Sequence, residues 1–344
     1  MRWPEDDEEL WWFVQAVWGI RIPRTPVCPG HSTPFAAFAE AYFGRVPVAV
    51  WKASRGFGGK SRTLAALSLT EAVALSAEIS LLGGSGAQSL NVHEATSEAW
   101  TWKNAPRHLI AKDRTKYDTY LTNGGHLRTL MASQTSVRGP HPQRLRLDEI
   151  DEMDLEILEA AQGQPMRKFR NGKWIETNTV MSSTHQYPDK TMTTIIKRAN
   201  KNGWPVHEWC YRENANPVDG WLSPDEIQRK RTEIPKHVWE TEYDLQEPNF
   251  EGRAIDTKAV ERCFDPNLGR FSGDRPVTIA EATREGLYVT GIDWAKEKDN
   301  TIISTFLATD YPWTCVSWQK LHRLPWPVMV RKALSQWRRY GGWL

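Results

Sequence analysis

The stretch SRGFGGKSR, residues 54–62, combines three glycines with a lysine and a hydroxyl at a spacing that can bind phosphate. A P-loop follows the pattern Gly-x-x-x-x-Gly-Lys-Ser/Thr, and this stretch departs from it only at Ser54, where a small residue still permits the turn. In such a loop the backbone N–H groups bind phosphate oxygens, Lys60 contacts the outer phosphates and Ser61 binds Mg²⁺. The residues of this candidate nucleotide site are Ser54, Arg55, Gly56, Phe57, Gly58, Gly59, Lys60, Ser61 and Arg62.

A second stretch, RLRLDEID at 144–151, is predicted to be a short strand that ends in acids. We expect Asp148 to hold Mg²⁺, directly or through water, and Glu149 to orient and deprotonate an attacking water. An Asp-Glu pair alone is common in solvated turns. Together with the glycine-rich stretch it indicates ATP and Mg²⁺ as the cofactors and ATP hydrolysis as the reaction.

Two arginines are candidates for neutralising charge on the departing phosphate. Arg55 lies inside the glycine-rich loop and can act within its own subunit, whereas Arg138, in SQTSVRGPHPQ, can reach a neighbouring subunit. Either can instead be a surface arginine. Ser182, Ser183 and Thr184 end the next expected strand, where they can sense hydrolysis and relay it or simply cap a helix.

The elements that must position these residues alternate between strands and helices. A buried strand at 46–53 leads into the glycine loop, and the apolar spacing of TLAALSLTEAVALSA predicts a helix directly after it. Further strands are expected at 78–84, 144–151 and 176–185, with a hairpin turning on 123–125. This alternation predicts an α/β fold with a mainly parallel sheet covered by helices on both faces. The extra strand between the two motifs favours the P-loop branch with an additional strand and a catalytic glutamate (ASCE type).

Composition excludes several classes of protein. The 344 residues carry a formal net charge of +2, so any nucleic-acid contact must come from local basic stretches such as 167–173 and 197–203. No stretch is apolar enough to span a membrane, and the acidic N-terminus is unlike a signal peptide. The four cysteines form no CxxC pair and the nine histidines show no zinc-finger spacing, so neither a disulfide framework nor a zinc site is expected. These features suit a reducing, intracellular compartment.

Together these residues resemble the large subunit of tailed-bacteriophage terminases. SRGFGGKSR looks like that family's variant Walker A loop, SVRG and LRLDEID look like its arginine-finger segment and Walker B strand, and SST looks like its coupling motif. The resemblance implies a molecular motor that packages double-stranded viral DNA into a procapsid and cuts it with a second, nuclease domain. It also implies a homo-oligomeric ring, expected to have five subunits, with the portal protein and the small terminase subunit as partners in the cytoplasm of the infected host. The family's layout places the adenine pocket at roughly 26–35.

The same resemblance divides the chain into an ATPase domain at 1–248, a Gly- and Pro-rich linker at 249–285 and the start of an RNase H-like nuclease domain at 286–344. Asp293 falls where that family places its first metal-binding aspartate, for Mg²⁺ or Mn²⁺. Asp299 and Asp310 are the other nearby acids, and Asp299 is expected to be a turn residue. Because the chain stops just after the first helix of this domain, we expect it to be truncated and to lack nuclease activity.

Two alternatives stay open at this stage. DEID also resembles the motif of DEAD-like helicases, but a helicase should continue into a second RecA-like domain with its own arginine motif. The other alternative is an assembly protein that binds nucleotide without hydrolysing it. Phosphate release by the wild type and by Glu149→Gln would separate the three hypotheses.

Overall fold

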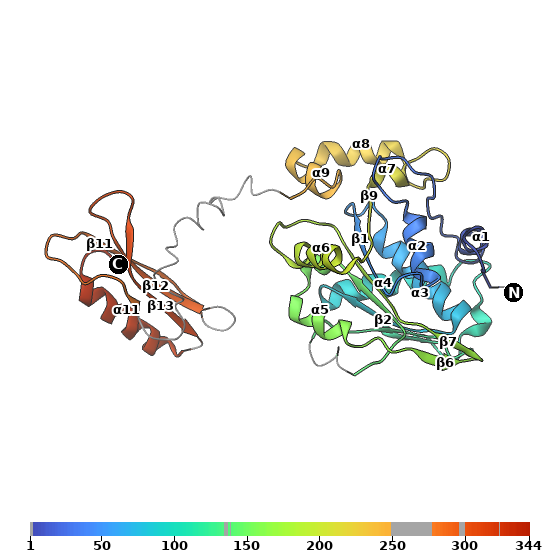
Figure 1. Ribbon diagram of the computed structural model, residues 1–344, viewed down its shortest axis with the longest axis horizontal. Helices are drawn as coiled ribbons and strands as arrows, with labels where there is room; N and C mark the ends of the chain where they lie inside the picture. Colours follow the sequence, from blue (N-terminus) through green and yellow to red (C-terminus); the bar gives the residue numbers. More distant parts are fainter. Residues whose placement is uncertain (1–2, 134–136, 138, 249–276, 296–299, 323) are drawn as a thin grey trace. The chain divides into compact units, whose positions relative to one another are not determined.

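The computed structural model describes residues 3–133, 137, 139–248, 277–295, 300–322 and 324–344. Its contacts divide the chain into two units, Met1–Arg253 and Ala254–Leu344 (Figure 1). Within the described ranges, no helix combines the length and the apolar character that crossing a lipid bilayer requires.

The first unit is built on a seven-stranded sheet with the strand order β3-β4-β2-β5-β8-β1-β9. Only β3 and β4 pair antiparallel, and all other neighbours run parallel, which confirms the mainly parallel sheet expected from the sequence. The strands of this sheet are β1 (Val48–Ala53), β2 (Glu78–Gly83), β3 (Asp118–Tyr120), β4 (His126–Thr129), β5 (Arg144–Asp148), β8 (Asn178–Ser183) and β9 (Val206–Trp209).

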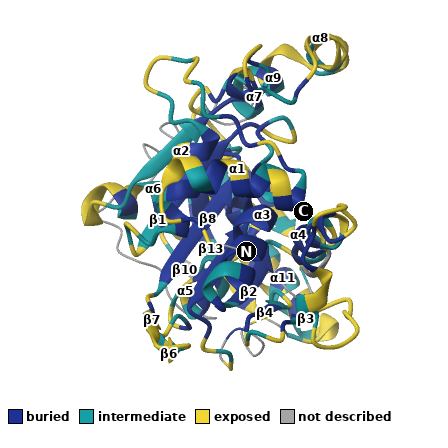
Figure 2. Cartoon of the chain, turned by 90° about the vertical axis from the view of Figure 1, so that its right-hand side faces the viewer, coloured by how far each residue is buried: buried dark blue, intermediate teal, exposed yellow. Residues whose placement is uncertain are grey.

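Helices cover both faces of this sheet, so its central strands are buried (Figure 2). Alternate residues of β1 show the two layers: Trp51 packs in one apolar cluster, with α1 to α4, and Val50 in another, with α5 and α6. Parallel strands need this double cover because neither face can remain in water. The covering helices are α1 (Asp7–Trp18), α2 (Pro34–Tyr42), α3 (Lys60–Leu75), α4 (Gly86–Ala99), α5 (Leu155–Gln162) and α6 (Thr191–Asn202); 3₁₀ turns lie at Arg107–Leu109 and Ile150–Glu152.

The strand that separates β1 from β5 in space is β8. The expectation that 78–84 would be the additional strand between the two motifs is therefore wrong in space, because β2 pairs on the other side of β5. Chain order misleads here because the crossover connections of a parallel sheet can insert a later strand between two earlier ones. As a result β8, which carries Ser182 and Ser183 and ends just before Thr184, lies directly between β1 and β5. The glycine loop follows β1, and the acids lie at the end of β5.

Three buried charges join α3 to β5. Arg144 and Arg146 alternate with leucines along β5, and both reach the Glu71 carboxylate of α3, at 3.0 Å from Arg144 Nε and 2.6 Å from Arg146 Nη2. The side chains of Glu71 and Arg146 are fully buried. Arg146 also donates to the backbone oxygens of Leu145 and Asn178. This group therefore fixes the helix that follows the glycine loop against the strand that ends in the acids.

One of the two basic stretches expected to bind nucleic acid forms a β-hairpin, and the other lies in a helix. Strands β6 (Lys168–Arg170) and β7 (Lys173–Ile175) pair antiparallel, and both Lys168 and Arg170 form ion pairs with Glu78. The stretch 197–203 covers the last turns of α6, where Arg198 pairs with Glu159. The short helices α7 (Tyr211–Asn214), α8 (Pro224–Glu233) and α9 (Lys236–Glu242) follow β9 and complete the unit.

The second unit contains a four-stranded antiparallel sheet, in the order β10-β13-β12-β11, and one long helix. Its elements are β10 (Val277–Thr278), β11 (Tyr288–Asp293), β12 (Asn300–Leu307), β13 (Thr314–His322) and α11 (Trp326–Tyr340). Three of these strands and the helix follow residue 286.

Asp293 and Asp310, the two candidate acids among the described residues of the second unit, do not lie together. Asp293 ends β11 opposite Ile302, whereas Asp310 follows the far end of β12, where Leu307 pairs with Tyr288. At about 3.4 Å per strand residue the two ends of this pair are roughly 15 Å or more apart. The two acids are therefore too far apart to bind the same metal ion, and the prediction of Asp310 as a candidate partner for Asp293 is wrong. Asp299 lies outside the described residues.

Candidate functional site

The glycine-rich loop connects β1 directly to α3, with Gly59 as the N-cap of the helix. Gly59 has φ 62°, which favours glycine, and a Cβ on Gly58 would lie 2.4 Å from the backbone oxygen of Ser54. No side chain caps the first turn of α3. The N–H groups of that turn, together with the positive end of the helix dipole, therefore form a place where an anion can bind.

Ser54, at the position of the first glycine, does not need a left-handed backbone. Its hydroxyl donates to the backbone oxygen of Tyr243 at 2.6 Å and accepts from the backbone N–H of Tyr211 at 3.1 Å. The loop is held further by the indole of Trp209, which donates to Gly58 O, and by the amide of Asn214, which donates to Phe57 O. The serine thus replaces a glycine without strain and attaches the loop to the segments after β9.

Two hydroxyl groups and one carboxylate meet where β5 and β8 end beside the first turn of α3. Ser61 Oγ donates to Asp148 Oδ2 at 2.6 Å, and Ser182 Oγ donates to Asp148 Oδ1 at 2.5 Å. Burial, and secondarily the charge of Glu149, raise the pKa of Asp148, while the two hydroxyl donors oppose that shift. A buried carboxylate beside a hydroxyl is a set of hard oxygen ligands that suits Mg²⁺.

Lys60 and Glu149 lie together beside this group. Lys60 Nζ is buried, donates to Thr184 Oγ1 at 2.8 Å and lies 3.7 Å from Glu149 Oε1. Ser183 Oγ is 3.3 Å from Glu149 Oε2. Glu149 itself has φ 51° and ψ 50°, a left-handed conformation that is uncommon outside glycine and is often found at functional sites. Each side chain of 182–184 therefore contacts a different member of the candidate site.

The two candidate arginines are placed differently. The Arg55 guanidinium lies at the edge of the site, 2.8 Å from Glu242, and its side chain is 60% exposed. That contact is the main reason why the pKa of Arg55 is raised. Arg138 lies outside the described residues. The guanidinium carbon of Arg62, in the first turn of α3, lies 5.8 Å from the centre of the Trp221 ring.

A cavity of about 240 Å³ opens between these groups. Besides residues expected from the sequence, polar side chains of Gln88, Asn91, Glu152 and Gln186 line it, and none of these was predicted. The available signal was weak: β2 ends beside β5, so the first turns of the following helix, α4, reach the same edge of the sheet. Only the order of the strands in space shows that residues of α4 reach the candidate site.

The fold was then compared with known proteins. No protein-family model matches the chain, and no curated protein sequence matches it. Among solved structures, the HK97 bacteriophage large terminase matches with a TM-score of 0.52 and 16% identity over 95% of this chain and 73% of that one. The large terminase of the thermophilic bacteriophage D6E matches with a TM-score of 0.47 and 11% identity over 89% and 76% of the two chains, and its complex with ADP with 0.47 and 12% over 87% and 72%.

The fold is terminase-like. At 16% identity the match to the HK97 protein shows the fold alone. The seven-stranded, mainly parallel sheet of the first unit agrees with the α/β fold expected from the sequence.

A cluster of four possible metal ligands was also not predicted from the sequence. No zinc site was expected from the sequence, yet the first unit brings together Cys28, His31, Cys210 and Glu213. The two cysteines are 182 positions apart, so no local spacing pattern could reveal the cluster.

Proposed function

We propose that this chain is the ATP-hydrolysing subunit of a motor that moves double-stranded viral DNA into a procapsid, as a terminase large subunit does. The observation that carries the proposal is the hydrogen bond of 2.6 Å between Ser61 and Asp148, with Lys60 Nζ 3.7 Å from Glu149. The hydroxyl of Ser61 and the two acids, from separate parts of the chain, thus line one cavity at a helix N-terminus, and Lys60 lies beside Glu149. The fold shared with the HK97 large terminase supports the same proposal.

The described residues fit a nucleotide with Mg²⁺. The first turn of α3 has no side-chain cap, which leaves its N–H groups for phosphate oxygens. Ser61 and Asp148 offer the hard oxygen ligands that would hold Mg²⁺. When bound, Mg²⁺ would neutralise charge on the phosphate oxygens.

The hydrolytic step then needs an acceptor for a proton and a cation for the phosphate. Glu149 would orient the attacking water and take its proton, since the carboxylate borders the cavity. Its contacts with Ser183, at 3.3 Å, and with Lys60, at 3.7 Å, are both long. Lys60 would leave Thr184 and pair with the outer phosphates. This exchange gives residues 182–184 a way to sense the nucleotide. Arg55, or Arg138 of a neighbouring subunit, would neutralise charge as the phosphate leaves.

The partners belong to the same proposal. Double-stranded DNA would be bound through phosphate contacts, in a ring of subunits that meets the portal protein and the small terminase subunit in the infected host. The ion pairs of Lys168 and Arg170 with Glu78 leave fewer free cations in 167–173 for this role than the sequence alone indicates. Asp293, in the second unit, would contribute to a divalent metal site of an RNase H-like nuclease.

Replacing Lys60 by alanine tests the nucleotide site. Hydrogen bonds to charged groups contribute about 1.5–3 kcal/mol, so we expect Lys60→Ala to weaken ATP binding about 10- to 100-fold. Fluorescent-nucleotide titration with Mg²⁺ measures the affinity, and thermal unfolding shows that the variant is folded. Lys230→Ala, on the surface of α8, is the control. Unchanged affinity in Lys60→Ala would remove the phosphate site and the proposed function with it.

Replacing Ser182 by alanine tests the metal ligand. Ser182 orients the Asp148 carboxylate, and loss of such a partner typically weakens metal binding about 10- to 100-fold. We expect the Mg²⁺ concentration that half-activates phosphate release to rise by that factor. Ser68→Ala, which removes another buried hydroxyl bonded to the backbone oxygen of Leu64, should leave this concentration unchanged. Equal Mg²⁺ dependence in Ser182→Ala and wild type would contradict the role of Asp148.

A further inference from the structure

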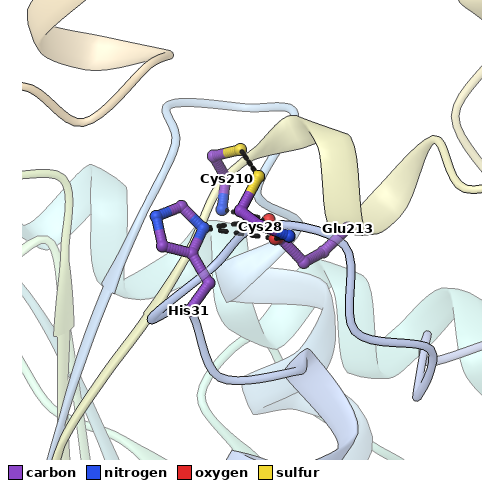
Figure 3. Close-up of side chains that lie close together, drawn as sticks. All are labelled: Cys28, His31, Cys210 and Glu213. Carbon is purple, nitrogen blue, oxygen red and sulfur yellow. Dashed lines mark hydrogen bonds and ion pairs between the residues drawn. The ribbon is translucent and has the colours of Figure 1, made fainter.

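The loop before α2 and the start of α7 bring two cysteines, a histidine and a glutamate together (Figure 3). Cys28 and His31 come from the loop, Cys210 is the N-cap of α7 and Glu213 lies in that helix. Their potential ligand atoms all lie within 4.8 Å of one another. Cys210 and Glu213 are fully buried, and the other two residues are partly buried.

We propose that Cys28, His31, Cys210 and Glu213 bind one Zn²⁺ ion as a structural site. Two thiolates, an imidazole and a carboxylate are all ligands that zinc accepts, and four protein ligands close a tetrahedral site. The proposal does not depend on the function proposed above, because none of these residues lines the cavity beside Asp148.

Two of the separations between ligand atoms agree with a tetrahedral site. Two sulfurs bound to zinc at about 2.3 Å lie roughly 3.8 Å apart at the tetrahedral angle, and Cys28 Sγ and Cys210 Sγ are 3.7 Å apart. A nitrogen and an oxygen bound at about 2.05 Å lie roughly 3.3 Å apart, and His31 Nδ1 is 3.2 and 3.3 Å from the two oxygens of Glu213. Both edges therefore already have the length that a zinc ion would impose.

The surrounding groups are those that support a metal ligand. The backbone N–H of Arg212 donates to Cys210 Sγ at 3.4 Å. The other ring nitrogen of His31 lies 3.7 Å from the Glu208 carboxylate, an arrangement that commonly orients a metal-binding histidine. The backbone N–H groups of Cys28 and Cys210 donate to the two oxygens of Glu213 and fix that carboxylate. The side chains of His31, Cys210 and Glu213 thus each have a contact that orients them.

A cation lies beside the proposed site. Binding would release a proton from each thiol, and Zn²⁺ with two thiolates and one carboxylate carries a net charge of −1. The Arg212 guanidinium, which also pairs with Asp244, lies 3.7 Å from Cys210 Sγ and is a cation next to that charge. A disulfide between Cys28 and Cys210 is the competing state, but it needs a sulfur separation of about 2.05 Å, and both cysteines are free.

The position of the cluster gives the metal a structural effect. Helix α7 supports the glycine loop through the amide of Asn214, which donates to Phe57 O, and through the N–H of Tyr211, which donates to Ser54 Oγ. A zinc ion would tie this helix to the loop before α2, across 182 positions of the chain. Removing it should loosen the support of the candidate nucleotide site.

Metal analysis of the untagged full chain, purified without chelators, tests the proposal. We expect one zinc per chain by mass spectrometry, lost in Cys28→Ser and in Cys210→Ser and retained in Cys315→Ser, which changes a cysteine of the second unit. Chelation should lower the melting temperature of the wild type. Replacing zinc by Co²⁺ in the wild type should give thiolate-to-cobalt absorption and the visible bands of a tetrahedral site.

The cobalt spectrum keeps the proposal falsifiable if the serine variants do not fold. Wild-type protein that binds neither zinc nor Co²⁺, or a Co²⁺ spectrum without thiolate bands, would overturn it. A Cys28–Cys210 disulfide in protein kept under reducing conditions would overturn it as well. Zinc that survives in both Cys28→Ser and Cys210→Ser would place the metal elsewhere and have the same consequence.

Discussion

Replacing Glu149 by glutamine is expected to slow ATP hydrolysis by about 10²- to 10⁴-fold, the usual contribution of a general base. Glutamine keeps the size of the side chain and an oxygen that can accept the hydrogen bond from Ser183. It cannot take a proton from water. Lys60, Ser61 and Asp148 are unchanged, so the affinity for ATP should stay close to that of the wild type, and the variant should accumulate in the nucleotide-bound state.

Phosphate release at saturating ATP and Mg²⁺, with double-stranded DNA present and at protein concentrations that allow self-association, measures this effect. Glu152→Gln is the matched control, because Glu152 is a second acid that lines the same cavity. Its loss of rate should be far smaller. If Glu149→Gln turns over as fast as the wild type, another group is the base. If neither protein turns over while both bind ATP, a nucleotide-binding assembly protein becomes the better description.

Replacing Glu71 by glutamine should destabilise the first unit by about 3–5 kcal/mol, the usual cost of removing one partner from a buried ion pair. Glu71 is the shared counter-charge of Arg144 and Arg146, and the side chains of all three are almost completely buried. Without it two guanidinium groups remain inside the protein with no carboxylate. Since Glu71 lies in α3 and the arginines in β5, the substitution should also separate the glycine loop from the acids.

Urea unfolding followed by circular dichroism measures this change. Glu159→Gln is the control, because it breaks an ion pair with Arg198 whose side chains are 36% and 46% exposed, and such pairs contribute about 0–1 kcal/mol. Similar losses in the two variants would show that Glu71 is not an essential counter-charge.

The sequence predicted those parts of the fold that depend on local chemistry. The glycine loop is recognisable because its backbone requirements, such as the left-handed Gly59, must be met by residues that are adjacent in the chain. Strands β1 and β2 were recognisable because a doubly covered strand is a short apolar run, whereas β9 was not predicted. Lys60, Ser61, Asp148 and Glu149 could be brought together in advance only because one motif specifies a partner for the other.

What the sequence could not predict depends on which strands become neighbours. RLRLDEID alternates arginine and leucine, a pattern that usually places the arginines in water, and here Glu71 of α3 makes their burial possible. The polar residues of α4 reach the cavity because β2 pairs with β5. The Cys28 and Cys210 cluster forms because the loop before α2 meets the end of β9, where the N–H of Ser32 donates to Glu208 O. Each case requires a long-range contact that no window of sequence contains.

The serine at the start of the glycine loop has a mechanical consequence. One hydroxyl holds the backbone N–H of Tyr211 and the backbone oxygen of Tyr243 at the same time. A change in the shape of the loop would therefore break both hydrogen bonds or move two distant segments with it. Ser54, which replaces the usual glycine of the motif, therefore couples movement of the loop to movement of α7 and of the end of α9.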